Sequence, residues 1–252
     1  MNTIMLEKRD AVAIITLNRP HVRNAISLEM AGELKACLSR MASDDSCKVV
    51  ILTGAGQAFV SGGDLEQFGA ARGKEEALPL LSQVADVLTL IDTYPKPVIA
   101  AINGTAVGGG CELAVSCHFR YAAAEAVLGF VQIGLHITTG WGGGSRLLRK
   151  LPEAKALALL LTGERIGAEE ARKLGFVDQV FPQETLLEET FSFAQKIARQ
   201  PLSSIEAYMR LLAWHRSGMA TEACIRQEVE QCASLWGSEP HRAAVRRFLE
   251  KN

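Results

Sequence analysis

Apolar and polar positions follow two different periods along the first half of the chain. Short apolar runs, typical of buried strands, are separated by longer segments in which apolar residues recur every three or four positions, as on one face of a helix. Residues 8–10 form the turn of a predicted hairpin whose two faces are both covered. The predicted strands cover residues 4–6, 11–17, 48–53 and 97–101, and the predicted helices begin after a cap at Ser27 and at residue 75.

The second half changes from a mixed pattern to a purely helical one. Strands are predicted at residues 119–122, 127–131 and 176–181, with helices at 153–161 and 168–173 between them. After Pro182, helical periodicity covers residues 184–199, 201–216, 221–235 and 240–250. We therefore predict an α/β core over residues 1–195 and a helical region over residues 196–252 that is suited to a subunit contact.

Three glycine-rich turns join a strand to a helix, within residues 58–65, 102–117 and 134–147. Strands that alternate with helices in this way predict an α/β fold, with the turns gathered at the ends of the strands. A glycine-rich turn before a helix leaves backbone N–H groups free at the positive end of the helix dipole, with no Cβ to keep a ligand away.

Glu112 lies one turn inside the helix that follows the central glycine turn. Free backbone donors beside a carboxylate are typical of a site that stabilises a developing negative charge while a proton moves. If the N–H groups of Gly63 and Gly109 converge, they form an oxyanion hole with two donors. From these residues alone, an equally good interpretation is that the glycines only allow close packing and that Glu112 is solvated.

Composition and charge exclude several classes of protein. The 252 residues are 48% hydrophobic and carry a formal net charge of −1, so electrostatics gives no reason to expect nucleic acid or an anionic membrane as partner. No apolar run approaches the roughly 20 residues that span a bilayer, and the N-terminus lacks the layout of a signal peptide, so we expect a cytoplasmic protein. The six cysteines lack metal-ligand spacing, and we predict reduced thiols and no metal site.

Several segments together resemble the crotonase superfamily, the enoyl-CoA hydratase/isomerase family. They occur in the family's order and cover nearly the whole chain. The matching segments are LNRP at residues 17–20 with Asn24 and Ala25, AFVSGGDL at 58–65, PVIAAING at 97–104, GGGCEL at 108–113 and LTG at 161–163.

The resemblance implies a spiral of ββα units followed by a helical trimerisation region, a homotrimer or homohexamer, and an acyl-CoA thioester as substrate. It also implies a lyase or isomerase that needs no further cofactor, because the substrate itself carries coenzyme A. The N–H groups of Gly63 and Gly109 would hold the thioester oxygen as an enolate forms, with Glu112 as general acid and base. Coenzyme A would bind near Arg23, Asn24, Ser61, Gly63 and Leu65.

One position departs from the hydratase pattern. Hydratases of the family use two glutamates about twenty residues apart; Glu112 matches the first, and Gln132 stands at the second. An amide can orient water but cannot exchange a proton near neutral pH. This departure counts against efficient hydration, whereas isomerisation of a double bond needs only one base, so the function predicted is that of the enoyl-CoA hydratase/isomerase family as a whole.

Other segments resemble the ethylmalonyl-CoA decarboxylase branch, which also lacks the second glutamate: FVQ at residues 130–132, GWGG at 140–143 and LWG at 235–237. Decarboxylation of a malonyl-type ester needs mainly an oxyanion hole and a pocket that desolvates the departing carboxylate. Trp141 would supply an apolar wall there or serve only packing. His136 is a candidate pocket residue with a structural role as the alternative. A non-catalytic CoA-ester-binding or RNA-binding relative is the remaining hypothesis, and the net charge disfavours RNA.

Three further residues near the glycine turns have simpler interpretations. Asp64 is expected to cap the helix after the first turn, with a position facing the pocket as the alternative. His118 is expected to be a structural histidine. Cys111 has no neighbouring base to activate it, so we do not expect nucleophilic catalysis.

Overall fold

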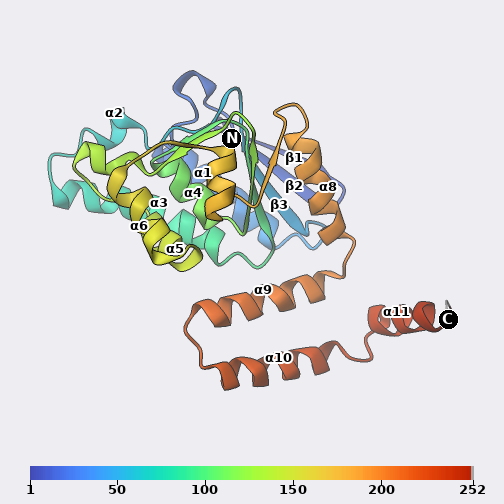
Figure 1. Ribbon diagram of the computed structural model, residues 1–252. Helices are drawn as coiled ribbons and strands as arrows, with labels where there is room; N and C mark the ends of the chain where they lie inside the picture. The colour runs from blue at the N-terminus through green and yellow to red at the C-terminus, as the bar shows by residue number, and fades with distance from the viewer. Residues whose placement is uncertain (251–252) are drawn as a thin grey trace.

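The strands of the chain form two sheets, and most successive pairs of strands contribute one strand to each sheet. The computed structural model describes residues 1–250 (Figure 1). The larger sheet has the order β1-β2-β3-β5-β7-β10 and is parallel except for the β1–β2 hairpin. Its strands are β1 (Ile4–Arg9), β2 (Val12–Leu17), β3 (Val49–Gly54), β5 (Val98–Ile102), β7 (Phe119–Ala123) and β10 (Gln179–Phe181).

The smaller sheet has the order β4-β6-β8-β9 and is made of short strands that follow those of the larger sheet along the chain. Its strands are β4 (Ala58–Val60), β6 (Thr105–Val107), β8 (Val127–Gly129) and β9 (Ile166–Gly167). The pairs β3–β4, β5–β6 and β7–β8 are each followed by helix, so the predicted spiral of ββα units is confirmed.

Several boundaries differ from the sequence prediction. The hairpin turns at Asp10 and Ala11 because β1 runs on to Arg9, and β1 is partly exposed while β2 is almost entirely buried. The strand predicted at 176–181 is shortened to β10, and the strand predicted at 127–131 ends at Gly129, where the 3-10 helix η2 (Val131–Leu135) takes over two residues later. Strands β6 and β9 were not predicted.

The helices of the core begin where capping residues and glycine turns indicate. Ser27 caps α1, since its hydroxyl oxygen accepts a hydrogen bond from the N–H of Met30 at 3.1 Å. Helix α8 packs on strands of the larger sheet. The core helices are α1 (Leu28–Ala42), α2 (Leu65–Phe68), α3 (Lys74–Asp92), α4 (Gly109–Ser116), α5 (Gly143–Lys150), α6 (Glu153–Thr162), α7 (Ala168–Leu174) and α8 (Leu186–Ala198).

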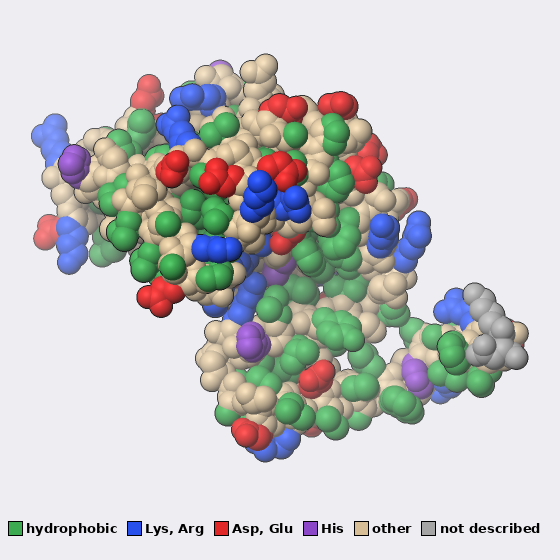
Figure 2. Space-filling model, in the orientation of Figure 1, with side chains coloured by type: hydrophobic (Ala, Val, Ile, Leu, Met, Phe, Trp, Pro, Cys, Tyr) green, Lys and Arg blue, Asp and Glu red, His purple; other side chains and the backbone are tan. Residues whose placement is uncertain are grey.

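The last three helices extend away from the sheets (Figure 1). They are α9 (Leu202–Arg216), α10 (Thr221–Leu235) and α11 (Glu239–Leu249), and α9 packs on α10. Hydrophobic side chains gather at the surface of these helices (Figure 2), including Tyr208, Val229 and Trp236. The boundary at residue 195 stays a prediction, and the last two residues of the predicted helical region lie outside the described part. Within residues 1–250, no helix combines the length and apolar character of a membrane span.

Candidate active site

A cavity of about 850 Å³ opens where the three glycine turns meet. Strand β4 leads into it from the smaller sheet, helix α4 begins at it, and the segment before α5 closes one side. The residues that line it include Arg23, Ser61, Gly63, Asp64, Leu65, Gly109, Glu112, Gln132 and Trp141. Most of the site residues predicted from sequence therefore share one pocket.

Gly63 and Gly109 border the same aromatic ring. A Cβ on Gly63 would lie 3.2 Å from Cζ2 of Trp141, and a Cβ on Gly109 would lie only 2.0 Å from Cζ3 of that ring. Only glycine therefore fits beside the indole at position 109. Among residues 1–250, neither the Gly63 N–H nor the Gly109 N–H donates a hydrogen bond, so both donors remain available to a ligand.

Glu112 is buried, with 2% of its surface exposed, and its carboxylate accepts four hydrogen bonds. Oε2 accepts from the N–H groups of Trp141 at 2.9 Å and Gly143 at 2.8 Å, and Oε1 accepts from the Gly140 N–H at 3.3 Å and from Gln132. A Cβ on Gly143 would lie 2.3 Å from Cγ of Glu112, so glycine is what lets this turn close over the carboxylate. Burial raises the pKa of Glu112, and the four hydrogen bonds oppose that rise.

Gln132 touches Glu112 directly. Its Nε2 donates to Oε1 of Glu112 at 2.9 Å, which fixes the orientation of the amide because a carboxylate can only accept. The carbonyl oxygen Oε1 of Gln132 is buried and has no hydrogen-bond partner in the described chain. Position 132 thus holds a neutral side chain that stabilises the carboxylate of Glu112.

Trp141 forms an apolar wall of the cavity. The indole is buried, its ring centroid lies 5.9 Å from that of Phe68, and Leu81 lines the same cavity. The indole N–H is buried without an acceptor in the described residues. Trp141 therefore limits the space beside Gly63 and Gly109, as well as donating its backbone N–H to Glu112.

Two predicted site residues do not line the cavity. The Asn24 side chain is buried in the loop before α1: its Nδ2 donates to the carbonyls of Ala55 and Ala58, and its Oδ1 accepts from the N–H of Arg19. His136 is exposed at the end of η2 in a left-handed conformation, with φ of 57°. The amide of Asn24 holds backbone groups together, and the cavity is lined instead by both neighbours of His136 in the chain.

Asp64 combines both roles considered for it. It caps α2 by accepting from the N–H groups of Glu66 and Gln67, and it also lines the cavity. The ion pair of Asp64 with Arg19, 2.8 Å long, was missed because the sequence offers no sign that these charges meet. Burial opposes ionisation of Asp64, but the hydrogen bond and charge of Arg19 lower its pKa overall.

Cys111 and His118 are structural residues. The Cys111 thiol donates to the carbonyl of Ala106 and accepts from the N–H of Gly129, and burial raises its pKa to about 12, so a nucleophilic thiolate does not form. His118 accepts from the N–H of Val98, and burial lowers its pKa to about 3. No cluster of three or more metal-ligating side chains occurs in the described part.

Fold and site together define a protein whose partly apolar pocket offers a ligand two backbone donors that are unpaired among the described residues and a buried carboxylate, Glu112. Residues 7–252 match the family model described as "Enoyl-CoA hydratase/isomerase". The chain belongs to this family of the crotonase superfamily and is an acyl-CoA enzyme of that class.

Individual relatives cover almost the entire chain. A probable enoyl-CoA hydratase of Bacillus subtilis is 34% identical, with 100% of this chain and 97% of the relative covered. A crotonyl-CoA hydratase of Syntrophomonas wolfei is 36% identical, with 98% and 95% covered. The crystal structure of an enoyl-CoA hydratase from Bacillus anthracis superposes with a TM-score of 0.94 at 32% identity, covering 99% of this chain and 97% of that one. Similarity to the decarboxylase branch stays a prediction.

Proposed function

We propose that the cavity binds an acyl-CoA thioester and that the N–H groups of Gly63 and Gly109 stabilise the enolate formed from it. Both N–H groups are unpaired among residues 1–250 and lie against one ring, and Gly109 begins helix α4, so the arrangement is suited to a developing oxyanion. Arg23, Ser61 and Leu65 line the cavity and are available to the coenzyme A part of the substrate. No cofactor besides the substrate's own coenzyme A is needed for this chemistry.

Glu112 is the proposed general acid and base. Among the described residues that line the cavity, it is the buried carboxylate that no cation holds, since Asp64 is paired with Arg19 and Glu66 is exposed. A single carboxylate can remove a proton from one carbon and return it to another. The observation that Gln132 donates to Glu112 therefore favours double-bond isomerisation over hydration, which in this family divides its work between two carboxylates.

Decarboxylation of a methylmalonyl- or ethylmalonyl-type ester is the second candidate. In that reaction the bond between the α-carbon and the carboxylate breaks, carbon dioxide leaves, and the electron pair forms the thioester enolate, which a proton then quenches. The Glu112 carboxylate already accepts four hydrogen bonds, and the Trp141 ring lies beside both oxyanion donors. These features favour a reaction that depends on the oxyanion hole and on an apolar wall more than on a free base.

One panel assay separates these reactions. Crotonyl-CoA, a 3-enoyl-CoA and methyl- or ethylmalonyl-CoA are incubated separately with the wild-type protein and with Glu112→Gln, and the products are identified by mass. We expect isomerisation by the wild type and a loss of about 10²–10⁴-fold in Glu112→Gln. Turnover of a malonyl-type ester that survives this substitution would identify the decarboxylase instead.

Two results would contradict parts of the proposal. Unchanged isomerisation in Glu112→Gln would show that a group other than Glu112 carries the proton. Binding of CoA esters without turnover of any of them would support a non-catalytic binding protein. A parallel measurement of RNA binding covers the remaining hypothesis, for which the net charge of −1 offers no support.

We also propose that the protein is a homotrimer or homohexamer. The described residues of helices α10 and α11 include none that is buried within the single chain, and the apolar side chains of these helices lie at the surface. Contiguous exposed apolar area is typical of an interface. Sedimentation or light scattering gives the mass directly, and a monomer would contradict this assignment.

A further inference from the structure

A buried carboxylate with three arginines stands behind the candidate active site. Asp92, at the end of α3, has 8% of its side-chain surface exposed and pairs with Arg149 at 2.7 Å, Arg216 at 3.0 Å and Arg146 at 3.5 Å. Burial disfavours ionisation of Asp92, but the three guanidinium groups lower its pKa overall. Arg216 comes from α9, so Asp92 joins the C-terminal helices to the core.

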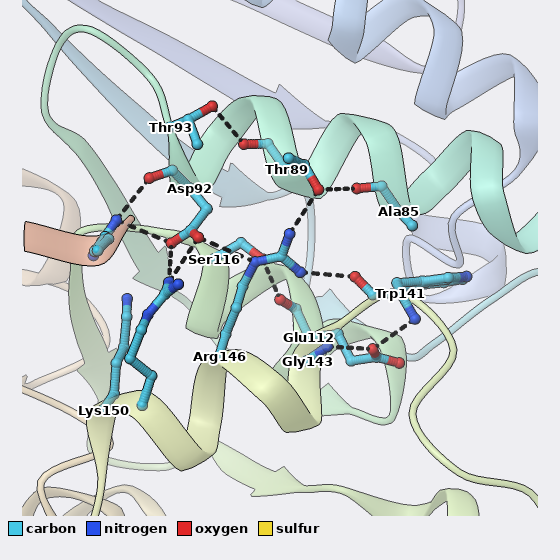
Figure 3. Close-up of polar contacts among 12 residues, drawn as sticks. Ala85, Thr89, Asp92, Thr93, Glu112, Ser116, Trp141, Gly143, Arg146 and Lys150 are labelled. Atoms are coloured by element: carbon cyan, nitrogen blue, oxygen red, sulfur yellow. Dashed lines mark hydrogen bonds and ion pairs between the residues drawn. The ribbon is translucent and has the colours of Figure 1, made fainter. Parts of the chain in front are cut away.

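Of the three arginines, Arg146 also reaches the active site. Its Nη1 donates to the backbone carbonyl of Trp141 at 2.8 Å, and its Nη2 donates to the Thr89 hydroxyl at 2.9 Å. Figure 3 shows Arg146 lying between Asp92 on one side and Trp141 on the other. The guanidinium therefore ties the turn before α5 to helix α3.

The turn before α5 also donates hydrogen bonds to Glu112, the proposed acid and base. The N–H groups of Trp141 and Gly143 supply both hydrogen bonds to Oε2 of Glu112. The carbonyl that Arg146 holds belongs to the same residue, Trp141, whose N–H contacts the carboxylate. A displacement of the turn is thus transmitted to Glu112 through one residue.

We propose that Arg146 is a positioning residue: it fixes the turn of residues 140–143 so that Glu112 keeps the orientation and charge that proton transfer needs, and Asp92 holds Arg146 in place. This inference rests on the role proposed for Glu112. It concerns a side chain that is expected not to touch substrate, since Arg146 is not among the described residues that line the cavity.

The surroundings of Glu112 give the sign of the expected pH effect. The positive charge of Arg146 on α5 interacts with Glu112, with Asp92 on α3 behind it, while Asp64 lines the same cavity and the Cys111 thiol on α4 is neutral. Removing the Arg146 charge and weakening the hydrogen bonds from the N–H groups of Trp141 and Gly143 both disfavour the ionised form of Glu112. The acid limb of the kcat profile, where Glu112 becomes protonated, therefore moves to higher pH.

The test compares Arg146→Gln with Arg149→Gln as matched control, using the ester that the panel assay finds to be turned over. Both variants remove one arginine of α5 from Asp92, but the side-chain hydrogen bonds of Arg149 go to Asp92 and not to the turn. For Arg146→Gln we expect a fall of about 10²-fold in kcat with little change in KM, because a misplaced catalytic group costs about this much, together with the shifted acid limb. Arg146→Lys, which keeps the charge, should recover part of the shift.

Arg149→Gln should keep both kcat and the pH profile of the wild type. Equal changes in the two variants, or an unchanged profile in a folded Arg146→Gln, would overturn the inference. If Arg146→Gln does not fold, Thr89→Val removes the hydroxyl that accepts from Nη2 and that also donates to the Ala85 carbonyl, and it should lower kcat several-fold. No effect of Thr89→Val would then count against positioning. An inactive Glu112→Gln with silent Arg146 variants refutes this inference alone, whereas a Glu112→Gln that isomerises at the wild-type rate refutes the role proposed for Glu112.

Discussion

Replacing Gln132 by glutamate should convert the site toward hydration. The substitution puts a second carboxyl group where the amide now donates to Oε1 of Glu112 at 2.9 Å. Size and shape are conserved, and the pocket around position 132 is already formed. The change therefore tests chemistry rather than packing.

The energetic cost of a second ionised carboxylate follows from the distance between the two side chains. Two carboxylate charges about 3 Å apart repel by about 5 kcal/mol at an effective dielectric constant of about 20. The lost amide donor adds a further cost of about 1.5–3 kcal/mol for a hydrogen bond to a charged group. The pair avoids both costs by sharing one proton, because the introduced carboxyl group, when protonated, can donate to Glu112 as the amide does. One acid and one base then stand side by side at neutral pH, as hydration requires.

The assay is the conversion of crotonyl-CoA to 3-hydroxybutyryl-CoA, followed by product mass. We expect Gln132→Glu to hydrate about 10²–10⁴-fold faster than the wild type, the usual contribution of a positioned acid or base. Gln132→Met, which removes the donor without adding a carboxyl group, is the control and should gain nothing. Rapid hydration by the wild type, or no gain in a folded Gln132→Glu that still binds CoA esters, would refute the reasoning from Gln132.

Two further substitutions test other parts of the structure. Gly109→Ala drives a methyl group against Trp141 and should reduce turnover by about 10²–10³-fold, as expected for a lost oxyanion donor, whereas Gly32→Ala, with open space around it, should leave steady-state rates unchanged. His118 is neutral when folded, with a pKa of about 3, but titrates near 6.5 when unfolded, so acidification below about pH 6.5 should cost about 1.4 kcal/mol of stability per pH unit. His118→Gln should flatten this dependence in urea unfolding at different pH values, and an unchanged slope would show that other groups cause it.

Much of the fold could be predicted because its strands and helices carry clear periods. The cap at Ser27, the three glycine turns and the long helices all follow from local sequence. Strands β6 and β9 could not be found this way, since three or two residues are too few to show a period. They exist because neighbouring strands of the smaller sheet supply their hydrogen bonds.

The residues of the candidate site were likewise predictable only in part. Gly63, Gly109, Glu112 and Trp141 meet in one cavity as the resemblance implied. Asn24 does not line the cavity, and its residue type does not reveal that backbone carbonyls satisfy its amide. Its part in coenzyme A binding stays a prediction.

Asp92 and Arg146 gave no sequence signal. They stand far apart in the chain, and charges on helices are ordinarily solvated. Only the tertiary structure shows that they meet.

The backbone donors and the carboxylate of the site differ in how many hydrogen bonds must break before the proposed chemistry can occur. The N–H groups of Gly63 and Gly109, the proposed oxyanion donors, donate no hydrogen bond within residues 1–250 and can receive a thioester oxygen at once. Glu112, by contrast, must give up a hydrogen bond before it takes a proton. Its Oε2 is held by two short bonds from the turn that Arg146 fixes, while Oε1 has the longest of the four, 3.3 Å from the Gly140 N–H. We infer that Oε1, the oxygen beside Gln132, is the one that exchanges protons, because opening its bond to Gly140 costs least. The residue at position 132 thus acts on the same oxygen that carries the proton, which is why a change from amide to carboxyl there should alter the reaction and not merely its rate.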